Sequence, residues 1–211
     1  MSGNLIRRSA RSRSAHSAPA ARTGRLHVDS AGRIAAATQV ISPNCDERPA
    51  GERIDLLVIH NISLPPGEFG GTAIVNLLAN RLDPSAHPSF VALSALRVSA
   101  HFLIRRDGEL LQFVPCTRRA WHAGTSSWQG RERCNDFSIG VELEGADHVP
   151  YPDAQYSVLA RLTRALSRCY PIASIAGHDQ IAPGRKTDPG PAFDWSRYRA
   201  LVARRHSGRA R

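Results

Sequence analysis

The segment that most constrains the fold of this chain is a long amphipathic helix, predicted at residues 153–170. Its sequence, DAQYSVLARLTRALSRCY, repeats apolar residues at helical spacing, with Asp153 in the position of an N-cap and Pro171 directly after the end. A helix with one apolar stripe must bury that stripe against another element. Short apolar runs elsewhere in the chain are typical of strands, so the sequence predicts an α/β fold.

These apolar runs predict a mixed sheet. Residues 55–60 (DLLVIH) have the continuous apolar pattern of a buried strand, and residues 137–143 (FSIGVEL) alternate as a half-exposed strand does. Residues 99–105 and 110–114 are separated by an Asp-Gly turn and predict a hairpin. The remaining elements are a strand at 172–176 and helices at 72–81 and 194–204. We therefore expect a single domain with a central mixed β-sheet flanked by helices.

Charge is unevenly distributed and suggests where the domain begins and ends. The 211 residues carry a formal net charge of +10. Residues 1–34 hold seven arginines and one acidic residue, the last eight residues hold four arginines and no acidic residue, and the body between them is formally neutral. We predict a flexible Arg/Ser-rich tail at 1–33, one folded domain at 34–204 and a basic tail at 205–211. Because no base-stacking or groove-reading motif accompanies these arginines, we expect no nucleic-acid partner.

The composition of the N-terminal segment and the spacing of the cysteines indicate the cellular compartment. The segment is basic but has no apolar stretch of a secretory signal, although its Arg- and Ser-rich composition also resembles an organelle transit peptide. No apolar run approaches the ~18 residues of a membrane span. The four cysteines form no CxxC pair, which suits reduced thiols. We expect a cytoplasmic bacterial protein without a membrane partner, acting as a monomer.

Two histidines stand at the ends of predicted strands. His60 ends the run at 55–60, His178 follows the strand at 172–176, and Asp188 comes ten residues after His178. Active-site groups of open α/β sheets collect beyond the strand ends. Two histidines and a carboxylate around an open position have the composition of a catalytic zinc site. The alternative is that both histidines are merely hydrogen-bonded at strand ends, and the long spacing alone favours that alternative.

Glu142 and Lys186 are candidates for chemistry beside such a site. By strand alternation Glu142 shares a face with Gly140, which leaves room for a group to approach, and with Glu144, the rival carboxylate. Such a carboxylate suits a general base, and a surface carboxylate on an edge strand is the alternative. Lys186 is the one lysine among 28 basic residues. Lysine presents a compact ammonium where arginine presents a planar fork, so this position can be one where arginine does not serve.

Five segments carry a resemblance to a known family. They are LLVIHNISLPPGEFGG, LRVSAHFLIRRDGEL, RRAWHAG, QGRERCNDFSIGVELEG and GHDQIAPGRKTDPGPAFDW, and the match that contains them in order covers roughly residues 38–203. The chain resembles the AmpD-like N-acetylmuramyl-L-alanine amidases of bacterial cell-wall recycling. These belong to a zinc amidase superfamily with amidase-type phage lysozymes and peptidoglycan recognition proteins. The resemblance implies their fold and zinc-dependent hydrolysis of the amide between 1,6-anhydro-N-acetylmuramic acid and L-alanine in muropeptides.

The resemblance also implies roles for individual residues. The implied ligands of one Zn²⁺ per chain are His60, His178 and Asp188. Glu142 is implied as the general base and Lys186 as a positive group beside the metal. The positions that match muropeptide-binding residues are Asn61, Arg97, Trp121 and Arg133. Of two further histidines, we expect His122 to line the cleft and His101 to be a hydrogen-bonded core residue.

Two other functions stay open at this point. A peptidoglycan-binding module without turnover would share the fold, but the ligand set, Glu142 and Lys186 argue for an enzyme. An exported amidase acting on intact peptidoglycan would share the chemistry, but the N-terminal segment does not resemble an export signal. We therefore expect anhydro-muropeptides as the substrate.

Overall fold

The computed structural model describes residues 24–204, so residues 1–23 of the tail predicted at 1–33 and the whole tail predicted at 205–211 fall outside the described residues. Within 24–204 the chain forms a six-stranded sheet in the order β1-β5-β4-β9-β3-β10. Its strands are β1 (Thr38–Gln39), β3 (Leu56–Ile62), β4 (Phe102–Ile104), β5 (Leu110–Gln112), β9 (Ser138–Glu144) and β10 (Ser174–Gly177). Only the β4–β5 hairpin pairs antiparallel among these six strands, so the predicted mixed sheet is confirmed.

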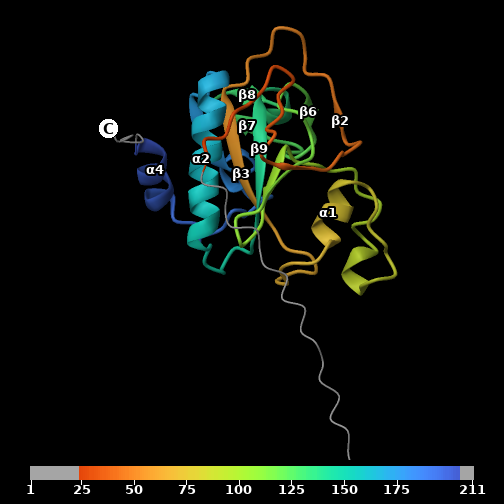
Figure 1. Cartoon of the computed structure of the whole chain (residues 1–211). Coiled ribbons are helices and arrows are strands. Elements are labelled where there is room, and N and C mark those ends of the chain that lie inside the picture. The colour runs from red at the N-terminus through yellow and green to blue at the C-terminus, as the bar shows by residue number, and fades with distance from the viewer. Residues whose placement is uncertain (1–23, 205–211) are drawn as a thin grey trace, which may run out of the picture.

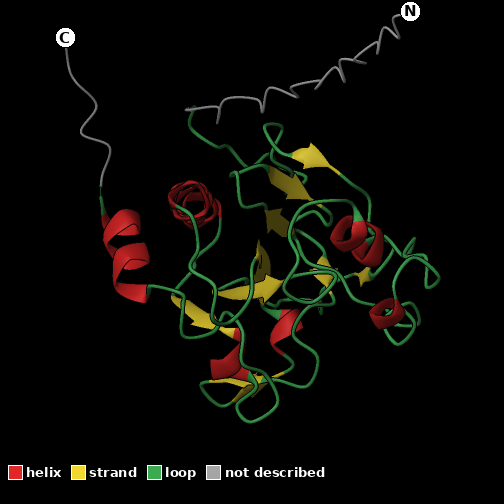
Figure 2. Ribbon diagram, turned by 90° about the horizontal axis from the view of Figure 1, so that it is seen from below, coloured by secondary structure: helices red, strands yellow, loops and turns green. Residues whose placement is uncertain are grey.

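Two short ribbons and four helices complete the described residues. The ribbons pair β2 (Cys45–Asp46) with β6 (Arg119–Ala120) and β7 (Ser127–Trp128) with β8 (Arg131–Glu132). The helices are α1 (Ala73–Leu78), α2 (Asp153–Cys169), α3 (His178–Ile181) and α4 (Trp195–Ala203). Helix α2 lies along one side of the sheet with α4 outside it, and α1 lies on the other side (Figure 1; Figure 2). No helix within 24–204 has both the length and the apolar character needed to cross a bilayer.

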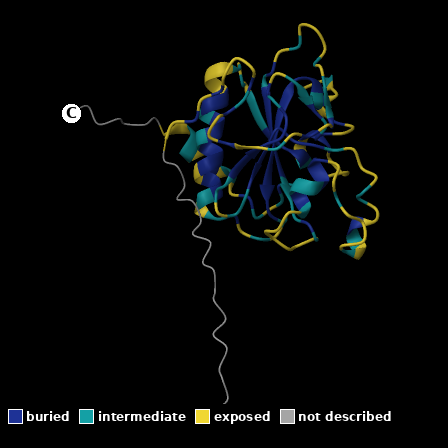
Figure 3. Cartoon of the chain, turned by 45° about the vertical axis from the view of Figure 1, so that its right-hand side comes forward, coloured by how far each residue is buried: buried dark blue, intermediate teal, exposed yellow. Residues whose placement is uncertain are grey.

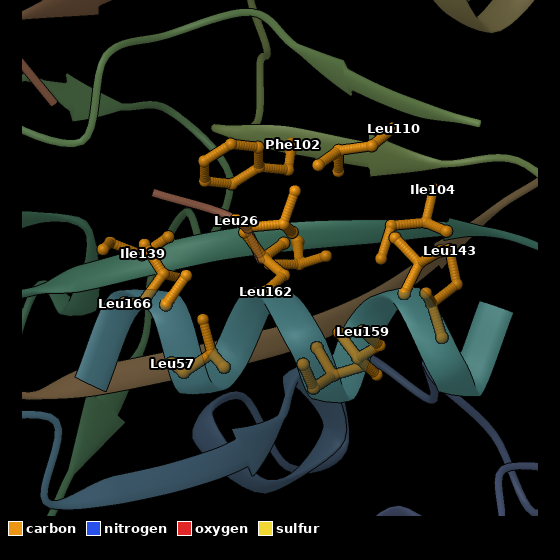
Figure 4. Close-up of a cluster of buried hydrophobic side chains, with 14 of the residues drawn as sticks. Leu26, Leu57, Phe102, Ile104, Leu110, Ile139, Leu143, Leu159, Leu162 and Leu166 are labelled. Carbon is orange, nitrogen blue, oxygen red and sulfur yellow. The ribbon is translucent and has the colours of Figure 1, made fainter. Parts of the chain in front are cut away.

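Helix α2 forms the main core with the central strands. Its apolar stripe, which includes Leu159, Leu162 and Leu166, packs on residues of β3 and β9 such as Leu57 and Ile139 (Figure 4). Each leucine side chain fully buried in this way contributes about 1.5–3 kcal/mol. The predicted helix is confirmed to within a residue, except that its N-cap is Pro152 and Asp153 is the first helical residue. There its negative charge still complements the helix dipole.

Strand β9 differs from its prediction as a half-exposed strand. All seven of its residues are buried, because β9 lies between β3 and β4 in the middle of the sheet (Figure 3). The alternation separates two buried faces. Ile139, Val141 and Leu143 join the α2 core, whereas Glu142 and Glu144 lie buried on the opposite face. Neither glutamate is therefore a surface carboxylate on an edge strand.

The folded domain begins earlier than the predicted boundary at residue 34. Leu26 and Val28 are 6% and 4% exposed and belong to the α2 core, whereas Arg25 before them and His27 between them are exposed. Arg168 of α2 donates a hydrogen bond of 2.8 Å to the Leu26 carbonyl. The boundary was wrong because two apolar residues in alternation, set among arginines, give too short a pattern to stand out.

Candidate active site

The sheet register brings the two strand-end histidines together. Strands β3 and β9 run parallel with His60 opposite Glu142, so both side chains project from the same face. Strand β10 pairs with β3 on the other side, with Gly177 opposite Ile59. His178 follows Gly177 directly and begins α3. Two residues 118 positions apart in the sequence are thus neighbours at the same edge of the sheet.

His60, His178 and Asp188 form a compact triangle of potential ligand atoms. His60 Nδ1 lies 3.0 Å from His178 Nδ1 and 3.1 Å from Asp188 Oδ2, and His178 Nδ1 lies 3.0 Å from the same oxygen. Among the described residues this is the trio that could hold a metal ion. The loop after α3 brings Asp188 back, and the Asp179 amide donates to its carbonyl at 2.9 Å.

The charge state of this triangle fits zinc. Burial lowers the pKa of His60 to about 4, although hydrogen bonding to Asp188 opposes the shift, so the imidazole is neutral at pH 7. Burial raises the pKa of Asp188, but its bonds to His178 and His60 outweigh this and hold it well below the usual value. His178 Nε2 donates to the Ala123 carbonyl at 3.1 Å, which leaves the Nδ1 lone pair free for a metal. Two imidazoles and one carboxylate are a zinc donor set.

Glu142 lies beside this triangle with an unsatisfied oxygen. It is 9% exposed, and its Oε2 has no hydrogen-bond partner among the described residues. Burial raises the pKa of Glu142 well above its usual value, the charge of Asp188 adds to the rise, and Lys186 opposes it. The Lys186 ammonium also lowers the pKa of His60 after larger contributions from burial and the neighbouring ligands. The charge of Lys186 therefore lowers the pKa of both Glu142 and His60, although Lys186 itself is exposed.

Glu144, the rival carboxylate, is instead bound by groups from two neighbouring loops. Its Oε1 accepts a hydrogen bond of 2.7 Å from the Gly70 amide and lies 3.4 Å from Arg105 Nη1. Its Oε2 accepts from the Arg106 amide at 3.2 Å. These partners fasten two loops to the end of β9. A carboxylate committed to so many donors is poorly suited to carrying a proton.

His122 and His101 lie behind the triangle. The space that Gly140 leaves on its strand face is filled by His122, which is 8% exposed and whose Nδ1 lies 2.9 Å from His60 Nε2. His101 is the core histidine expected, fully buried, with its Nδ1 accepting from the Gly140 amide at 3.0 Å and its Nε2 donating to the Arg118 carbonyl at 3.0 Å.

The predicted binding residues are spread around the site. Asn61 follows His60, and its Nδ2 donates to Asp147 Oδ1 at 2.8 Å. Trp121 is half-buried next to His122 in the chain. Arg97 is exposed and donates to carbonyls of its own turn, those of Ser94 and Leu96, at 3.3 Å. Asn61 lies at the triangle because it directly follows His60 in the chain. The hydrogen bonds of Arg97 stay within its own turn and do not join it to the triangle.

Arg133 lines a cleft next to α3. The cleft has a volume of about 610 Å³, and its walls include Arg133, Arg185 and Ile181. Arg133 is exposed, has a left-handed φ of 61° and lies 3.2 Å from Asp136. Arg185 was missed from the sequence. Its Nη2 donates at 2.7 Å to the same Ala123 carbonyl that receives His178 Nε2, and only the closeness of Lys186 in the chain could have suggested it.

Two further residues missed from the sequence brace the ligand-bearing loops. Asp147 binds the Asn61 amide, and its backbone packs so closely that a Cβ at Gly190 would lie 2.3 Å from its Cα. The Tyr151 hydroxyl donates to the Pro189 carbonyl at 2.8 Å. One segment therefore touches the residue after His60 and the residue after Asp188. No pattern in the sequence marks such a contact.

The mixed sheet, the triangle of two histidines and an aspartate, and the buried glutamate beside it are the arrangement expected of an amidase domain that could hold a metal ion. The family model described as N-acetylmuramoyl-L-alanine amidase matches residues 50–191, and the chain belongs to this family. The domain resembles solved amidases in its fold as well as in its sequence. A selenomethionine derivative of AmpD superposes with a TM-score of 0.80 at 62% identity, covering 82% of this chain and 97% of that one.

Curated relatives carry the same family name with a narrower activity. The 1,6-anhydro-N-acetylmuramyl-L-alanine amidase AmpD of Escherichia coli K12 is 61% identical over 82% of this chain and 96% of its own length. The protein of that name from Haemophilus influenzae is 50% identical over 78% of this chain and 91% of its own. AmiD from E. coli was solved with anhydro-N-acetylmuramic acid-L-Ala-D-γ-Glu-L-Lys. It is 32% identical with a TM-score of 0.52, covering 74% of this chain and 60% of that one.

Proposed function

We propose that this chain hydrolyses the amide between 1,6-anhydro-N-acetylmuramic acid and L-alanine in muropeptides released during cell-wall recycling. The observation that carries the proposal is the His60, His178 and Asp188 triangle with Glu142 at the same register of the sheet. The names and high identity of the AmpD relatives support the substrate. An amide-hydrolysing site needs an electrophilic centre and a proton carrier beside it; a metal held by the triangle would supply the first, and Glu142 offers the second.

The metal of the proposal is one zinc ion per chain, held by His60, His178 and Asp188. Zinc bound there would polarise the amide carbonyl and make a water molecule nucleophilic near neutral pH. The protein's part is to hold the two imidazoles and the carboxylate in one compact triangle, with the His60 ring kept neutral by burial. Three protein ligands leave a position open for the reacting groups.

Glu142 and Lys186 serve the transfer of protons and charge. Glu142 Oε2 is buried and without a partner among the described residues, so it is available to take a proton from the attacking water and give it to the leaving amine. Its raised pKa favours holding the proton between these two steps. The Lys186 ammonium offers positive charge to the oxyanion that develops on the amide oxygen.

Four residues are proposed to position the muropeptide. Trp121 offers a half-buried aromatic surface to the sugar or the stem. The Asn61 amide group is oriented by Asp147, which leaves its carbonyl oxygen as an acceptor. Arg97 and Arg133 are exposed, and their guanidinium groups can hold carboxylates of the stem peptide in bidentate fashion.

A cytoplasmic monomer is part of the proposal. All four cysteines lie within residues 24–204 and are free thiols, two of them buried, which suits a reducing compartment. Recycled anhydro-muropeptides are small and soluble, so the reaction calls for neither a membrane nor a nucleic-acid partner. Fractionation of cells and sedimentation of the purified chain would test location and oligomeric state.

The decisive experiment compares muropeptide substrates with and without a chelator. Purified full-length chain is incubated with anhydro and non-anhydro muropeptides, and the products are identified by mass spectrometry. We expect release of the intact stem peptide from the anhydro substrate, loss of this activity with chelator and recovery with added zinc. Full activity in a metal-free preparation would overturn the metal site. Binding without cleavage would favour a peptidoglycan-binding module, and a preference for intact peptidoglycan would favour an exported amidase.

A further inference from the structure

Behind the metal triangle lies a row of buried polar contacts that the proposed reaction does not use. His60 Nε2 lies 2.9 Å from His122 Nδ1, and His122 Nε2 lies 3.1 Å from the hydroxyl oxygen of Ser138. The three side chains come from β3, from the segment after β6 and from the first residue of β9. They are 1%, 8% and 0% exposed, so water cannot readily replace any of these contacts.

The structure makes specific room for the middle member of this row. A Cβ at residue 140 would lie 2.5 Å from His122 Cγ and 2.6 Å from its Nδ1, closer than real side chains approach. A glycine in the interior of a central strand weakens the strand, because it adds no side chain to the packing. Gly140 therefore marks a place where β9 gives up packing so that an imidazole ring can lie against its backbone.

The positions of the ring protons follow from these distances. A neutral imidazole carries one proton, on either nitrogen. For His60 to present a lone pair on Nδ1 to a metal, its proton must be on Nε2, and His122 must accept that proton's hydrogen bond through Nδ1. His122 then carries its own proton on Nε2 and donates to Ser138 Oγ. The opposite direction would put a proton on His60 Nδ1, inside the triangle of ligand atoms.

We propose that His122, supported by Ser138, is a positioning residue that fixes the tautomer and ring orientation of His60 for metal binding. The inference rests on the proposed zinc site. The second nitrogen of a metal-binding histidine is commonly bonded to a fixed acceptor, and loss of that partner typically weakens metal affinity about 10–100-fold. His178 uses a backbone carbonyl, that of Ala123, for this purpose. The His60 branch depends on a side chain and can therefore be tested by substitution.

The first test needs no variant. Nitrogen-15 NMR of the histidine rings in the full-length, zinc-loaded chain reports which ring nitrogen carries the proton. We expect His60 protonated on Nε2 and His122 to be neutral and protonated on Nε2. A zinc-loaded chain in which His122 is protonated on Nδ1 would overturn the proposal, because that nitrogen could then not accept from His60.

The second test measures zinc affinity by competition with a chromophoric chelator. His122→Phe keeps the ring volume but removes the acceptor, and we expect affinity to fall about 10–100-fold. His122→Asn places a carbonyl oxygen near the position of Nδ1 and should recover much of the loss. The matched control is His148→Phe in an exposed loop, which should bind zinc as the unsubstituted chain does.

The outcomes separate positioning from mere packing. The unfolding temperature of each variant is measured in chelator, so that packing is assessed apart from the metal. If the loss of zinc affinity comes from packing, affinity follows the unfolding temperature across the variants. If it comes from positioning, Asn restores zinc affinity whatever its unfolding temperature. If His122→Phe does not fold, Ser138→Ala takes its place, with a smaller loss of affinity expected. Unchanged affinity in a folded variant would overturn the role of His122. A failure of the unsubstituted chain to bind zinc would overturn the proposed function itself.

Discussion

The two faces of strands β3 and β9 differ in the kind of side chain that they bury. The face toward α2 is apolar up to Asn61, with residues such as Leu57, Ile59 and Val141 packed on the helix. The other face is equally buried but becomes polar toward the strand ends, where His60 and Glu142 lie. Apolar contacts are non-directional and tolerate small shifts, whereas a buried polar group is costly unless each partner is in place. Stability and chemistry are thus assigned to opposite sides of the same strands.

The largest effect is expected from removing the proton-carrying carboxylate, Glu142, from the polar face. Glu142→Gln should retain zinc but lose activity about 10²–10⁴-fold, since general-base catalysis contributes this much. Steady-state turnover of an anhydro-muropeptide, with zinc content measured in parallel, checks the expectation.

Glu144→Gln is the matched control on the same face. It should lower stability more than activity, because Glu144 holds the Gly70 amide and Arg105. If the two glutamine variants lose activity equally, Glu142 is not the base.

Lys186→Arg should also be strongly impaired, although it keeps the positive charge. Arginine spreads its charge over a planar fork, whereas lysine presents a compact ammonium that can approach a developing oxyanion. Loss of one such stabilising contact costs about 10²–10³-fold in turnover. Zinc content should not change, because Lys186 is outside the ligand triangle. Near-normal turnover in both Lys186→Arg and Lys186→Ala would refute the role.

The apolar face is tested by two deletions at the N-terminus. Deleting residues 2–33 removes Leu26 and Val28 from the α2 core, and each buried side chain contributes about 1.5–3 kcal/mol. Deleting residues 2–23 leaves every described contact intact. We expect the first deletion to lower the free energy of unfolding in urea by the sum of these contributions and the second to leave both stability and turnover nearly unchanged. Equal stability of the two truncated chains would show that the buried arm contributes nothing.

Leu162→Ala probes the same face from the helix. Leu162 is fully buried, so its truncation should cost about 2–5 kcal/mol of unfolding free energy in urea. Turnover measured well below the unfolding transition should be retained, because this face does not touch the site. Ser167→Ala, at an exposed position of the same helix, is the control and should change stability by no more than about 0.5 kcal/mol. A large loss of turnover in folded Leu162→Ala would mean that the two faces are coupled.

The sequence predicted what depends on local pattern and missed what depends on register and distant contact. Apolar runs identified β3 and β9, and the amphipathic stripe identified α2. Alternation alone does not say whether a strand lies at the edge or in the middle of a sheet, so the full burial of β9 was missed. His60 and His178 were singled out because they end apolar runs, but only the resemblance to the amidase family implied that they are metal ligands. Their closeness depends on the pairing of β10 with β3, for which the sequence has no local signal.

The wide separation of the proposed ligands along the chain would couple metal binding to folding. His60 and Asp188 are 128 residues apart, and the strand pairing that brings His178 beside His60 exists only in the folded chain. An ion that binds the native state and not the unfolded one stabilises the native state by mass action, about 2.7 kcal/mol when free ion is 100 times its dissociation constant. The folded fraction of a destabilised variant should therefore rise with free zinc, so that the supply of the ion sets how much of the chain is native as well as how much is active.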